Sequence, residues 1–534
     1  MAAQYTNIGK VISLLGDIGC SQFVVSPGSR NAPIVEAVSS SLATVVSHID
    51  ERCAGYVGLG IAKKSDLPVG LICTSGTAGL NYTPAIAEAY YQGVFLVAIT
   101  ADRPIGAVNS FESQTINQHG IFKNFVAAEV SISMNKEWTQ QSEESICSAL
   151  QKGIRANLPV HINLHLSEPL YDFEPLVEEA KTSPLARVDQ AQKTSNYKEI
   201  NIGAYKSPLV FLGFDRKKQK VGHGEKHFPL LTDACSHSFL EGNIFYYDFF
   251  LAKLSEEDGR LLQPDLLVTN GTYMLSKNLR NWLKKYPPKY HIHIDDNSNF
   301  ISLFTTNFKV IRDEPKNVLS QLTASVNYLD CWLTLEKKSE SAIKTKRANF
   351  SSSVFGILEC LLGQIDTHYL HCGNSMSVRY GALFQVMNRQ FKTVICNRGT
   401  SGIDGCVSTF LGYISSSNKK ECLLVGDVSF FYDSNALWMN RLPEEFLIIV
   451  INNGGGEIFE VINGPEKMNS GKEFITTPHQ VSVEYICNMH QISYVSLSSV
   501  SQTQEIDLFA NKRQIIEIFE GNKHLASDYK NLYG

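Results

Sequence analysis

ECLLVGD, residues 421–427, and FLIIVINNGGG, residues 446–456, are the most informative segments of this chain. Each contains a short apolar run, which is typical of a strand that is buried on both faces of a parallel sheet. The first run ends in GD and the second in NN, and Asn452 follows Asp427 by 25 residues. Because the carboxyl ends of parallel strands share one edge of a sheet, we expect these polar side chains to lie together at a ligand-binding edge.

The residue types at this edge indicate a site for a metal ion and a diphosphate. Asp427 offers an anionic oxygen, Asn453 offers a neutral one, and a backbone carbonyl beyond them can add a third. Mg²⁺ prefers such oxygen ligands and completes its shell with phosphate oxygens. The glycine run lets the backbone approach a diphosphate closely. Each dipeptide alone would indicate an ordinary turn, but their combination after two strands favours the metal–diphosphate interpretation.

Similar apolar runs recur on both sides of this region and predict an α/β protein of three domains. Strands are predicted at 23–26, 44–49, 69–74, 94–100, 208–214, 265–270, 290–296, 368–372 and 393–397, and a helix at 77–92. Strands that alternate with helices favour parallel sheets flanked by helices. Charged, strand-poor segments at 173–199 and 335–353 separate the blocks, so we predict domains at 1–185, 186–345 and 346–534. The first and third blocks have a similar layout, which suggests duplication.

Composition excludes several classes of protein. The 534 residues are 43% hydrophobic and 19% charged, with a net charge of -5, which excludes widespread disorder and a globally basic nucleic-acid binder. No apolar run approaches the ~20 residues of a membrane span, and the first residues do not resemble a signal peptide. The 12 cysteines include no CxxC pair, which favours the reducing cytoplasm. Gly58 and Gly60 lack the third glycine of a dinucleotide motif and are expected to permit close helix packing.

The GD…NN pattern is similar to the signature of thiamine diphosphate (ThDP) enzymes, although Val428 stands where that signature usually has glycine. The resemblance implies a pyrimidine-binding domain, a middle domain and a diphosphate-binding domain, in that order. It implies Asp427, Asn453 and the Gly455 carbonyl as ligands of Mg²⁺ or Mn²⁺, with Gly426 beside the cofactor. Because such sites form between subunits, it also implies a homodimer at minimum, with a homotetramer favoured.

Glu51 is the predicted acid of this chemistry. It follows the strand at 44–49 and opens a helix-like segment, as does the glutamate that holds the cofactor's aminopyrimidine N1′ in ThDP enzymes. A partly buried glutamate has a raised pKa, which suits proton sharing. The alternative is an acidic residue that only stabilises a helix N-terminus. The chain has no adjacent histidine pair, so paired imidazoles are not expected to relay protons.

Six motifs narrow the resemblance: SPGSRNAP (26–33), TSGTAGLN (74–81), TADRP (100–104), INQHG (116–120), GNSMSVR (373–379) and NRGTSGIDG (397–405). Together they resemble the MenD family, the 2-succinyl-5-enolpyruvyl-6-hydroxy-3-cyclohexene-1-carboxylate synthases of menaquinone biosynthesis. That branch also has a residue other than glycine after GD. The resemblance implies a transferase that decarboxylates 2-oxoglutarate and adds the succinyl group to isochorismate.

The substrates explain the arginines in these motifs. Both substrates are dianions, and three carboxylates remain after decarboxylation, so planar bidentate donors are expected. The resemblance assigns Ser29, Arg30, Asn117 and Gln118 to isochorismate, Lys277 less directly to the same substrate, and Ser375, Arg379 and Arg398 to the succinyl and carboxylate groups; Arg103 belongs to the same cluster. Alternatively, Arg103 caps a turn and Arg398 pairs with Asp404.

Three apolar residues complete the predicted site, and two other functions stay open. By the resemblance, Ile403 keeps ThDP bent, and Ile458 and Phe459 form an apolar wall, although all three could be ordinary core residues; His119 is expected to be structural. A pyruvate-using enzyme of the acetohydroxyacid synthase type is one alternative, against which the arginines count. A non-catalytic ThDP-fold protein is another, against which the presence of Glu51, Asp427 and Asn453 counts.

Overall fold

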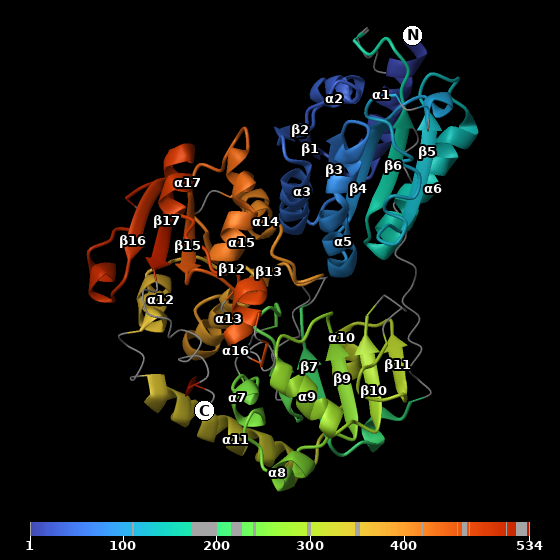
Figure 1. Ribbon diagram of the computed structural model, residues 1–534. Helices are drawn as coiled ribbons and strands as arrows, with labels where there is room; N and C mark the ends of the chain where they lie inside the picture. The colour runs from blue at the N-terminus through green and yellow to red at the C-terminus, as the bar shows by residue number, and fades with distance from the viewer. Residues whose placement is uncertain are drawn as a thin grey trace.

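The computed structural model describes residues 2–108, 110, 112–171, 173, 200–214, 227–238, 242–295, 301–347, 353–417, 420–456, 458–461, 467–468, 470–508, 510–519 and 531–532. Within these residues the chain forms three parallel sheets with helices packed against them (Figure 1). The predicted α/β class is therefore confirmed.

The first sheet has the strand order β2-β1-β3-β4-β6-β5. Its strands are β1 (Gln22–Val25), β2 (Thr44–Ser47), β3 (Val69–Cys73), β4 (Leu96–Asp102), β5 (Ala128–Ser133) and β6 (Val160–His165), and its helices are α1 (Ala2–Asp17), α2 (Ala32–Ser39), α3 (Glu51–Ser65), α4 (Thr77–Asn81), α5 (Thr83–Gln92) and α6 (Gln140–Ala156). Residues of β3 and β4 are buried throughout, as expected for strands covered on both faces.

The single helix expected at 77–92 is wrong, because the structure breaks it at Tyr82 into α4 and α5. Pro84 lies in the first turn of α5. A proline has no N–H to donate to the carbonyl four residues earlier, and its ring collides with that carbonyl. The proline therefore starts a new helix, and α4 is left as one short turn beside the end of β3.

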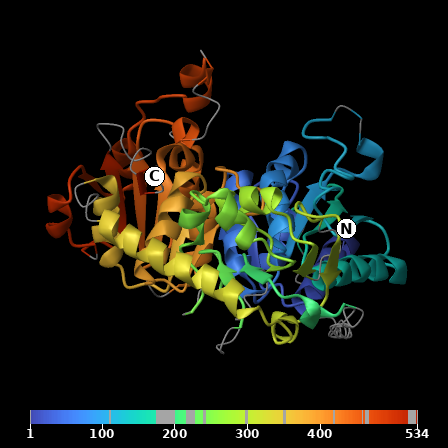
Figure 2. The same ribbon diagram turned by 90° about the horizontal axis from the view of Figure 1, so that it is seen from below.

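The middle sheet has the order β11-β10-β9-β7-β8. Its strands are β7 (Pro208–Leu212), β8 (Leu230–Thr232), β9 (Leu266–Asn270), β10 (Tyr290–Ile294) and β11 (Phe308–Ile311), and its helices are α7 (Tyr247–Leu251), α8 (Glu256–Leu261), α9 (Lys277–Lys285), α10 (Pro315–Leu319) and α11 (Val326–Arg347). The predicted boundary at 185/186 lies outside the described residues, and the one at 345/346 lies inside α11. Helix α11, the long helix of Figure 2, packs Trp332 into the middle core and Ile343 into the next.

The third sheet has the order β13-β12-β14-β15-β17-β16. Its strands are β12 (Tyr369–Cys372), β13 (Thr393–Cys396), β14 (Cys422–Gly426), β15 (Phe446–Asn452), β16 (Ser493–Leu497) and β17 (Arg513–Phe519), and its helices are α12 (Val354–Gly363), α13 (Met376–Asn388), α14 (Cys406–Ile414), α15 (Asp427–Tyr432), α16 (Ile458–Val461) and α17 (Val483–His490). By position in the sheet, this order repeats that of the first sheet. The similar layout seen in the sequence is thus matched in strand order.

Helices α3 and α14 join the first sheet to the third. A Cβ atom on Gly60 would collide with the carbonyl oxygen of Thr409, and one on Gly412 would collide with that of Val57. The backbones of the two helices are therefore in contact at these glycines. The predicted role of Gly60 in close helix packing is confirmed. Among the described residues no helix is long and apolar enough to cross a membrane.

Candidate functional site

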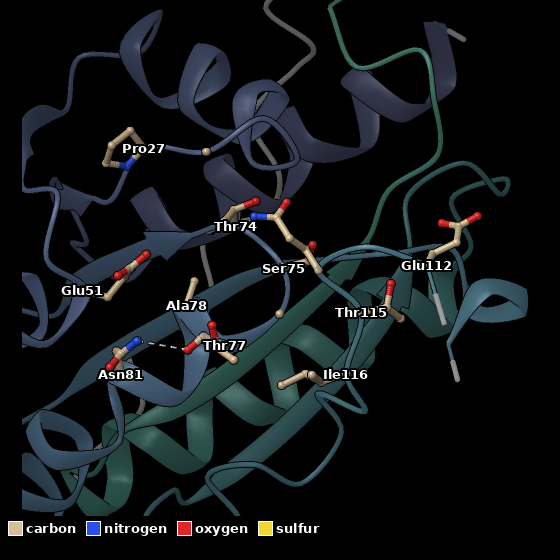
Figure 3. A pocket seen from close by; sticks show the side chains of 13 residues that line it. Pro27, Glu51, Thr74, Ser75, Thr77, Ala78, Asn81, Glu112, Thr115 and Ile116 are labelled. Atoms are coloured by element: carbon tan, nitrogen blue, oxygen red, sulfur yellow. Dashed lines mark hydrogen bonds between the residues drawn. The ribbon is translucent and has the colours of Figure 1, made fainter. Parts of the chain in front are cut away.

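A cavity of about 380 Å³ opens at the carboxyl ends of the first sheet's strands (Figure 3). Its lining residues come from the loops after β1, β3 and β4, from the N-terminus of α3 and from α4: Pro27, Gly28, Glu51, Thr74, Ser75, Gly76, Thr77, Ala78, Asn81, Glu112, Gln114, Thr115 and Ile116. All of them belong to the first sheet's part of the chain. The lining therefore includes no residue from the third sheet's part of the chain.

Glu51 is the first residue of α3, and its side chain lines the cavity. The preceding Asp50 caps the helix by accepting the backbone N–H of Cys53 at 3.2 Å. Burial raises the pKa of Glu51, and the negative charge of Asp50 raises it further. An acid that only stabilised a helix N-terminus would be more acidic than usual. Burial dominates here, so Glu51 holds a proton more readily than an exposed glutamate does.

The loop between β3 and α4 lines the cavity with hydroxyl groups. Thr74 Oγ1 and Ser75 Oγ are buried and have no hydrogen-bond partner among the described residues. The next residue, Gly76, has a φ of 86°, which favours glycine. Buried hydroxyls without partners are unusual in native proteins. The two hydroxyls therefore indicate a binding site for a polar ligand.

At the third sheet, Asp427 begins α15 directly after β14, as the strand prediction required. Its carboxylate accepts the backbone N–H groups of Val428 at 2.7 Å, Gly454 at 2.8 Å and Gly455 at 3.1 Å. Burial raises its pKa, and these hydrogen bonds work in the opposite direction. The end of β14 and the glycine run after β15 are therefore held together through one carboxylate.

The two asparagines of the NN pair have different positions. Asn452 donates to Glu517 at 2.6 Å inside the sheet and accepts the N–H of Gly454 at 3.1 Å. The Oδ1 atom of Asn453 is buried beside the glycine run. Asp427, Asn453 and the backbone near Gly455 thus supply hard oxygen donors, which fit Mg²⁺ or Mn²⁺.

Sequence reasoning missed the segment that covers the glycine run. His479 Nε2 lies 3.2 Å from Asp427 Oδ2, and the His479 N–H donates to the Gly454 carbonyl at 3.0 Å. The carbonyl oxygen of Thr476 would lie 2.9 Å from a Cβ atom on Gly455. In the described part of the chain no group of three or more His, Cys, Asp or Glu side chains could hold a metal. Besides Asp427, a metal there would therefore need neutral oxygens from the protein and the phosphate oxygens of a bound diphosphate.

Two predicted arginines lie beside the first sheet and are held by its own residues. Arg30 is buried and donates to the Leu166 carbonyl and to Glu168 Oε1, each at 3.0 Å. Arg103 donates to the Ser113 carbonyl at 2.7 Å and lies 3.5 Å from Glu112, a residue of the cavity wall. Ser29 shares a hydrogen bond of 2.7 Å with Tyr171, at the surface.

Asn117 and Gln118 do not line the cavity. Asn117 is exposed and accepts the N–H of His119 at 3.2 Å. The Gln118 side chain is buried; it accepts the Gly76 N–H at 2.8 Å and donates to Asn163 Oδ1 at 2.8 Å. In this structure Gln118 supports the cavity wall from behind. The distant partner Asn163 gave no signal in the local sequence.

The remaining predicted cations belong to the middle and third sheets' parts of the chain. Arg379 donates to the Ser375 carbonyl at 2.6 Å, and Ser375 has a φ of 66°. Arg398 donates to Asn374 Oδ1 at 3.1 Å. Lys277 is exposed at the start of α9.

The apolar candidates are placed by the third sheet's loops. The Ile403 carbonyl accepts the Ser429 hydroxyl at 3.1 Å, and the neighbouring Asp404 accepts the Tyr56 hydroxyl at 2.7 Å. Ile458 packs against the core of the third sheet. The Phe459 ring lies against Gly456, where a Cβ atom would be 2.9 Å from it.

Known proteins resemble this chain over most of its length. Residues 9–125 match the family described as thiamine pyrophosphate enzyme, N-terminal TPP binding domain. A 2-succinyl-5-enolpyruvyl-6-hydroxy-3-cyclohexene-1-carboxylate synthase of Flavobacterium psychrophilum is 32% identical over 98% of each chain. Proteins of the same name from Bacteroides thetaiotaomicron (91% of this chain and 89% of the relative) and Christiangramia forsetii (94% and 93%) are each 33% identical.

Proposed function

Since this chain belongs to the 2-succinyl-5-enolpyruvyl-6-hydroxy-3-cyclohexene-1-carboxylate synthase family, the MenD family, we propose that it performs the reaction of that family. In this reaction 2-oxoglutarate loses CO₂, and its succinyl part adds in 1,4 fashion to isochorismate. The chain is then a ThDP-dependent transferase of menaquinone biosynthesis. The observation that carries the proposal is the cavity-lining Glu51, whose pKa burial raises, in a domain that matches the ThDP-binding family.

The residues present fit the cofactor at both ends. Glu51 would hold the aminopyrimidine ring, while Asp427, Asn453 and the Gly455 carbonyl would hold Mg²⁺ or Mn²⁺ and, through it, the diphosphate. Five further residues would lie against the cofactor: Ser375, Ile403, Gly426, Ile458 and Phe459. When bound, ThDP supplies a nucleophilic carbon and takes up the electron pair that CO₂ leaves behind.

The chain's own residues then prepare the reaction. Glu51, with its raised pKa, is suited to sharing a proton with the pyrimidine N1′ nitrogen. The Thr74 and Ser75 hydroxyls at the cavity wall have no hydrogen-bond partner among the described residues, so both could bond to a ligand.

The cations orient the two acids. Arg379, Arg398 and Lys277 approach from the third and middle sheets, and we assign the first two to the carboxylates of 2-oxoglutarate and Lys277 to isochorismate. Five residues of the first sheet belong to the isochorismate side: Ser29, Arg30, Arg103, Asn117 and Gln118. Gln118 would act there through the Gly76 loop, whose N–H it accepts.

A complete site requires a second copy of the chain. The cavity at Glu51 has lining residues only from the first sheet's part of the chain, whereas the metal ligands belong to the third. Ile49 and Leu80 are large apolar residues left 47% and 43% exposed beside Glu51 and Asn81, where a partner could cover them. We therefore propose a homodimer as the smallest active unit, and a homotetramer as its further assembly. The 12 free cysteines are consistent with a reducing cytoplasm.

Mass spectrometry of the products tests this function. The purified chain is supplied with 2-oxoglutarate, isochorismate, ThDP and Mg²⁺, and the expected product has the mass of the isochorismate–succinyl adduct. Release of CO₂ is compared for 2-oxoglutarate and pyruvate. Turnover of pyruvate without turnover of 2-oxoglutarate would indicate an enzyme of the acetohydroxyacid synthase type. Absence of turnover with any 2-oxoacid would indicate a non-catalytic protein.

A further inference from the structure

The loop after β13, residues 397–403, carries Arg398 and Ile403, which the proposed function assigns to the substrate and to the cofactor. The side-chain amide of Asn374 holds both ends of this loop. It donates to the loop's first carbonyl at 2.7 Å and to the carbonyl of Gly402 at 2.6 Å. Asn374 follows β12, so the third sheet itself fixes the ends of the loop.

Glu88 of helix α5, on the first sheet, holds the middle of the same loop. One of its carboxylate oxygens accepts the Gly399 N–H and the other accepts the Thr400 N–H, each at 2.6 Å. The Thr400 hydroxyl also donates to the second oxygen at 2.6 Å. A Cβ atom on Gly399 would lie 2.6 Å from the Glu88 carbonyl oxygen, so the loop lies directly against the helix. The Tyr273 hydroxyl, from the middle sheet's part of the chain, donates to the Gly399 carbonyl.

The Glu88 carboxylate is buried without a cation. Glu88 is 1% exposed, and within the described part of the chain it forms no ion pair with a lysine, arginine or histidine. A buried carboxylate of this kind is stable only where N–H and O–H groups donate to it. One such donor is the amide of Gln92 on the same helix, and the others belong to Gly399 and Thr400. Glu88 therefore favours the loop conformation that supplies these donors.

We propose that Glu88 is a positioning residue, which fixes this loop so that Arg398 and Ile403 stay in place for the substrate and the cofactor. The inference rests on the proposed function, because that function gives these two residues their roles. Glu88 does not line the cavity of the first sheet and acts only through the loop. A helix of the first sheet thus contributes to the site by holding a loop of the third.

The variants E88Q and E421Q, compared with wild type, test the proposal. E88Q keeps the size of the side chain but places an NH₂ group, which cannot accept, against one of the two backbone N–H groups of the loop. Glu421 provides the matched control, because it is a carboxylate only 5% exposed that lies 2.8 Å from His371 and 3.5 Å from Lys64 of α3. It directly precedes β14, at the edge of the sheet opposite to the loop. E421Q therefore weakens another buried contact between the same two sheets.

Hydrogen exchange, followed by mass spectrometry, measures the loop without turnover. In E88Q the peptide that contains Gly399 and Thr400 should exchange about tenfold faster than in wild type, because one of its amides loses its acceptor. E421Q should leave the exchange of this peptide within about twofold of wild type. Equal protection of the peptide in E88Q and wild type would overturn the proposal.

Kinetics at a temperature where every variant is fully folded measure the consequence for the site. E88Q should raise the KM for 2-oxoglutarate and lower kcat, so that kcat/KM falls by about 10²-fold, because small displacements of positioning groups are costly. In E421Q the urea midpoint should fall as in E88Q, but both constants should stay within about twofold of wild type. If E88Q had the kinetic constants of E421Q, the role of Glu88 would be merely structural and the proposal would be overturned.

A second pair of variants keeps the test decisive if E88Q does not fold. T400A removes only the hydroxyl that donates to Glu88, and S417A removes the hydroxyl that donates to Glu421 at 3.2 Å. T400A should lower kcat/KM about threefold and S417A should not change it; an unchanged kcat/KM in T400A would then overturn the proposal. If the wild type released no CO₂ from 2-oxoglutarate, the proposed function would fail, while hydrogen exchange would still decide whether Glu88 fixes the loop.

Discussion

The first and third sheets have the same strand order by position but different chemistry at their carboxyl ends. The equivalent strands β2 and β13 are each followed by a helix, and these two helices, α3 and α14, pack directly against each other. Equivalent elements of the two sheets thus meet where α3 and α14 lie side by side (Figure 1). The same strand order thus occurs twice in the chain, and glycines allow the two equivalent helices to pack closely.

The equivalent strand ends have different side chains. After β3, the first sheet presents the hydroxyls of Thr74 and Ser75, whereas after β14 the third presents the carboxylate of Asp427. After β2, the first sheet presents Glu51, whereas Arg398 follows β13. The strand order therefore provides the positions, and a few loop residues decide the chemistry. The first sheet thus presents a partly buried acid with a raised pKa, and the third presents a carboxylate that is bonded to a glycine run.

The largest expected effect comes from removing the acid of the first sheet. E51Q should lower CO₂ release from 2-oxoglutarate by about 10²–10⁴-fold, because an amide cannot exchange a proton with the pyrimidine ring. E51Q should still bind ThDP, and quenching of the protein's fluorescence on addition of ThDP measures this binding. D50N is the control, because it removes the neighbouring charge while an asparagine still caps α3. Turnover of E51Q close to that of wild type would refute the role of Glu51.

The next effect concerns the contact between the two sheets. Arg52 on α3 lies 3.0 Å from Asp433, whose side chain is 0% exposed, and also donates to the Asp404 carbonyl. R52A leaves a buried carboxylate without its guanidinium and should lower the free energy of unfolding by about 3–5 kcal/mol, measured with urea. The double variant R52A/D433N should be less destabilised than the sum of the single variants. Additive losses would show that the two side chains do not stabilise each other.

The smallest effect is a pH dependence of stability at Glu51. Burial raises the pKa of Glu51 in the folded chain, so folding favours the protonated form, and stability is lost as the pH rises through the folded pKa. E51Q, which carries no charge, should therefore be more stable than wild type at neutral pH. The difference should disappear below the pKa of an unfolded glutamate. Melting temperatures measured across this pH range check the sign, and a less stable E51Q at neutral pH would contradict it.

The sequence predicts local features of this fold well, because they depend on local residue patterns. The runs around β14 and β15 are uniformly apolar, and their polar ends place Asp427 at the sheet edge. The break at Tyr82 was also predictable, since Pro84 cannot continue a helix from α4. The apolar periodicity of 77–92 continues through both helices, so periodicity alone does not mark the break.

Features that depend on distant residues could not be predicted in this way. Gln118 is buried because Asn163, 45 residues away, accepts from its amide. His479 reaches Asp427 through a loop with no distinctive motif. In each case the partner is set by tertiary packing, which a single sequence does not reveal.

Subunit complementation tests most directly whether the two sheets of different chains form one site. E51Q and D427A are coexpressed with different tags, and the mixed dimer is isolated by two affinity steps. If Glu51 of one chain works with Asp427 of the other, one of the two sites in this dimer contains neither substitution. The mixed dimer should then regain about half of the wild-type activity, although each variant alone is inactive. A mixed dimer as inactive as its parents would contradict a site shared between subunits.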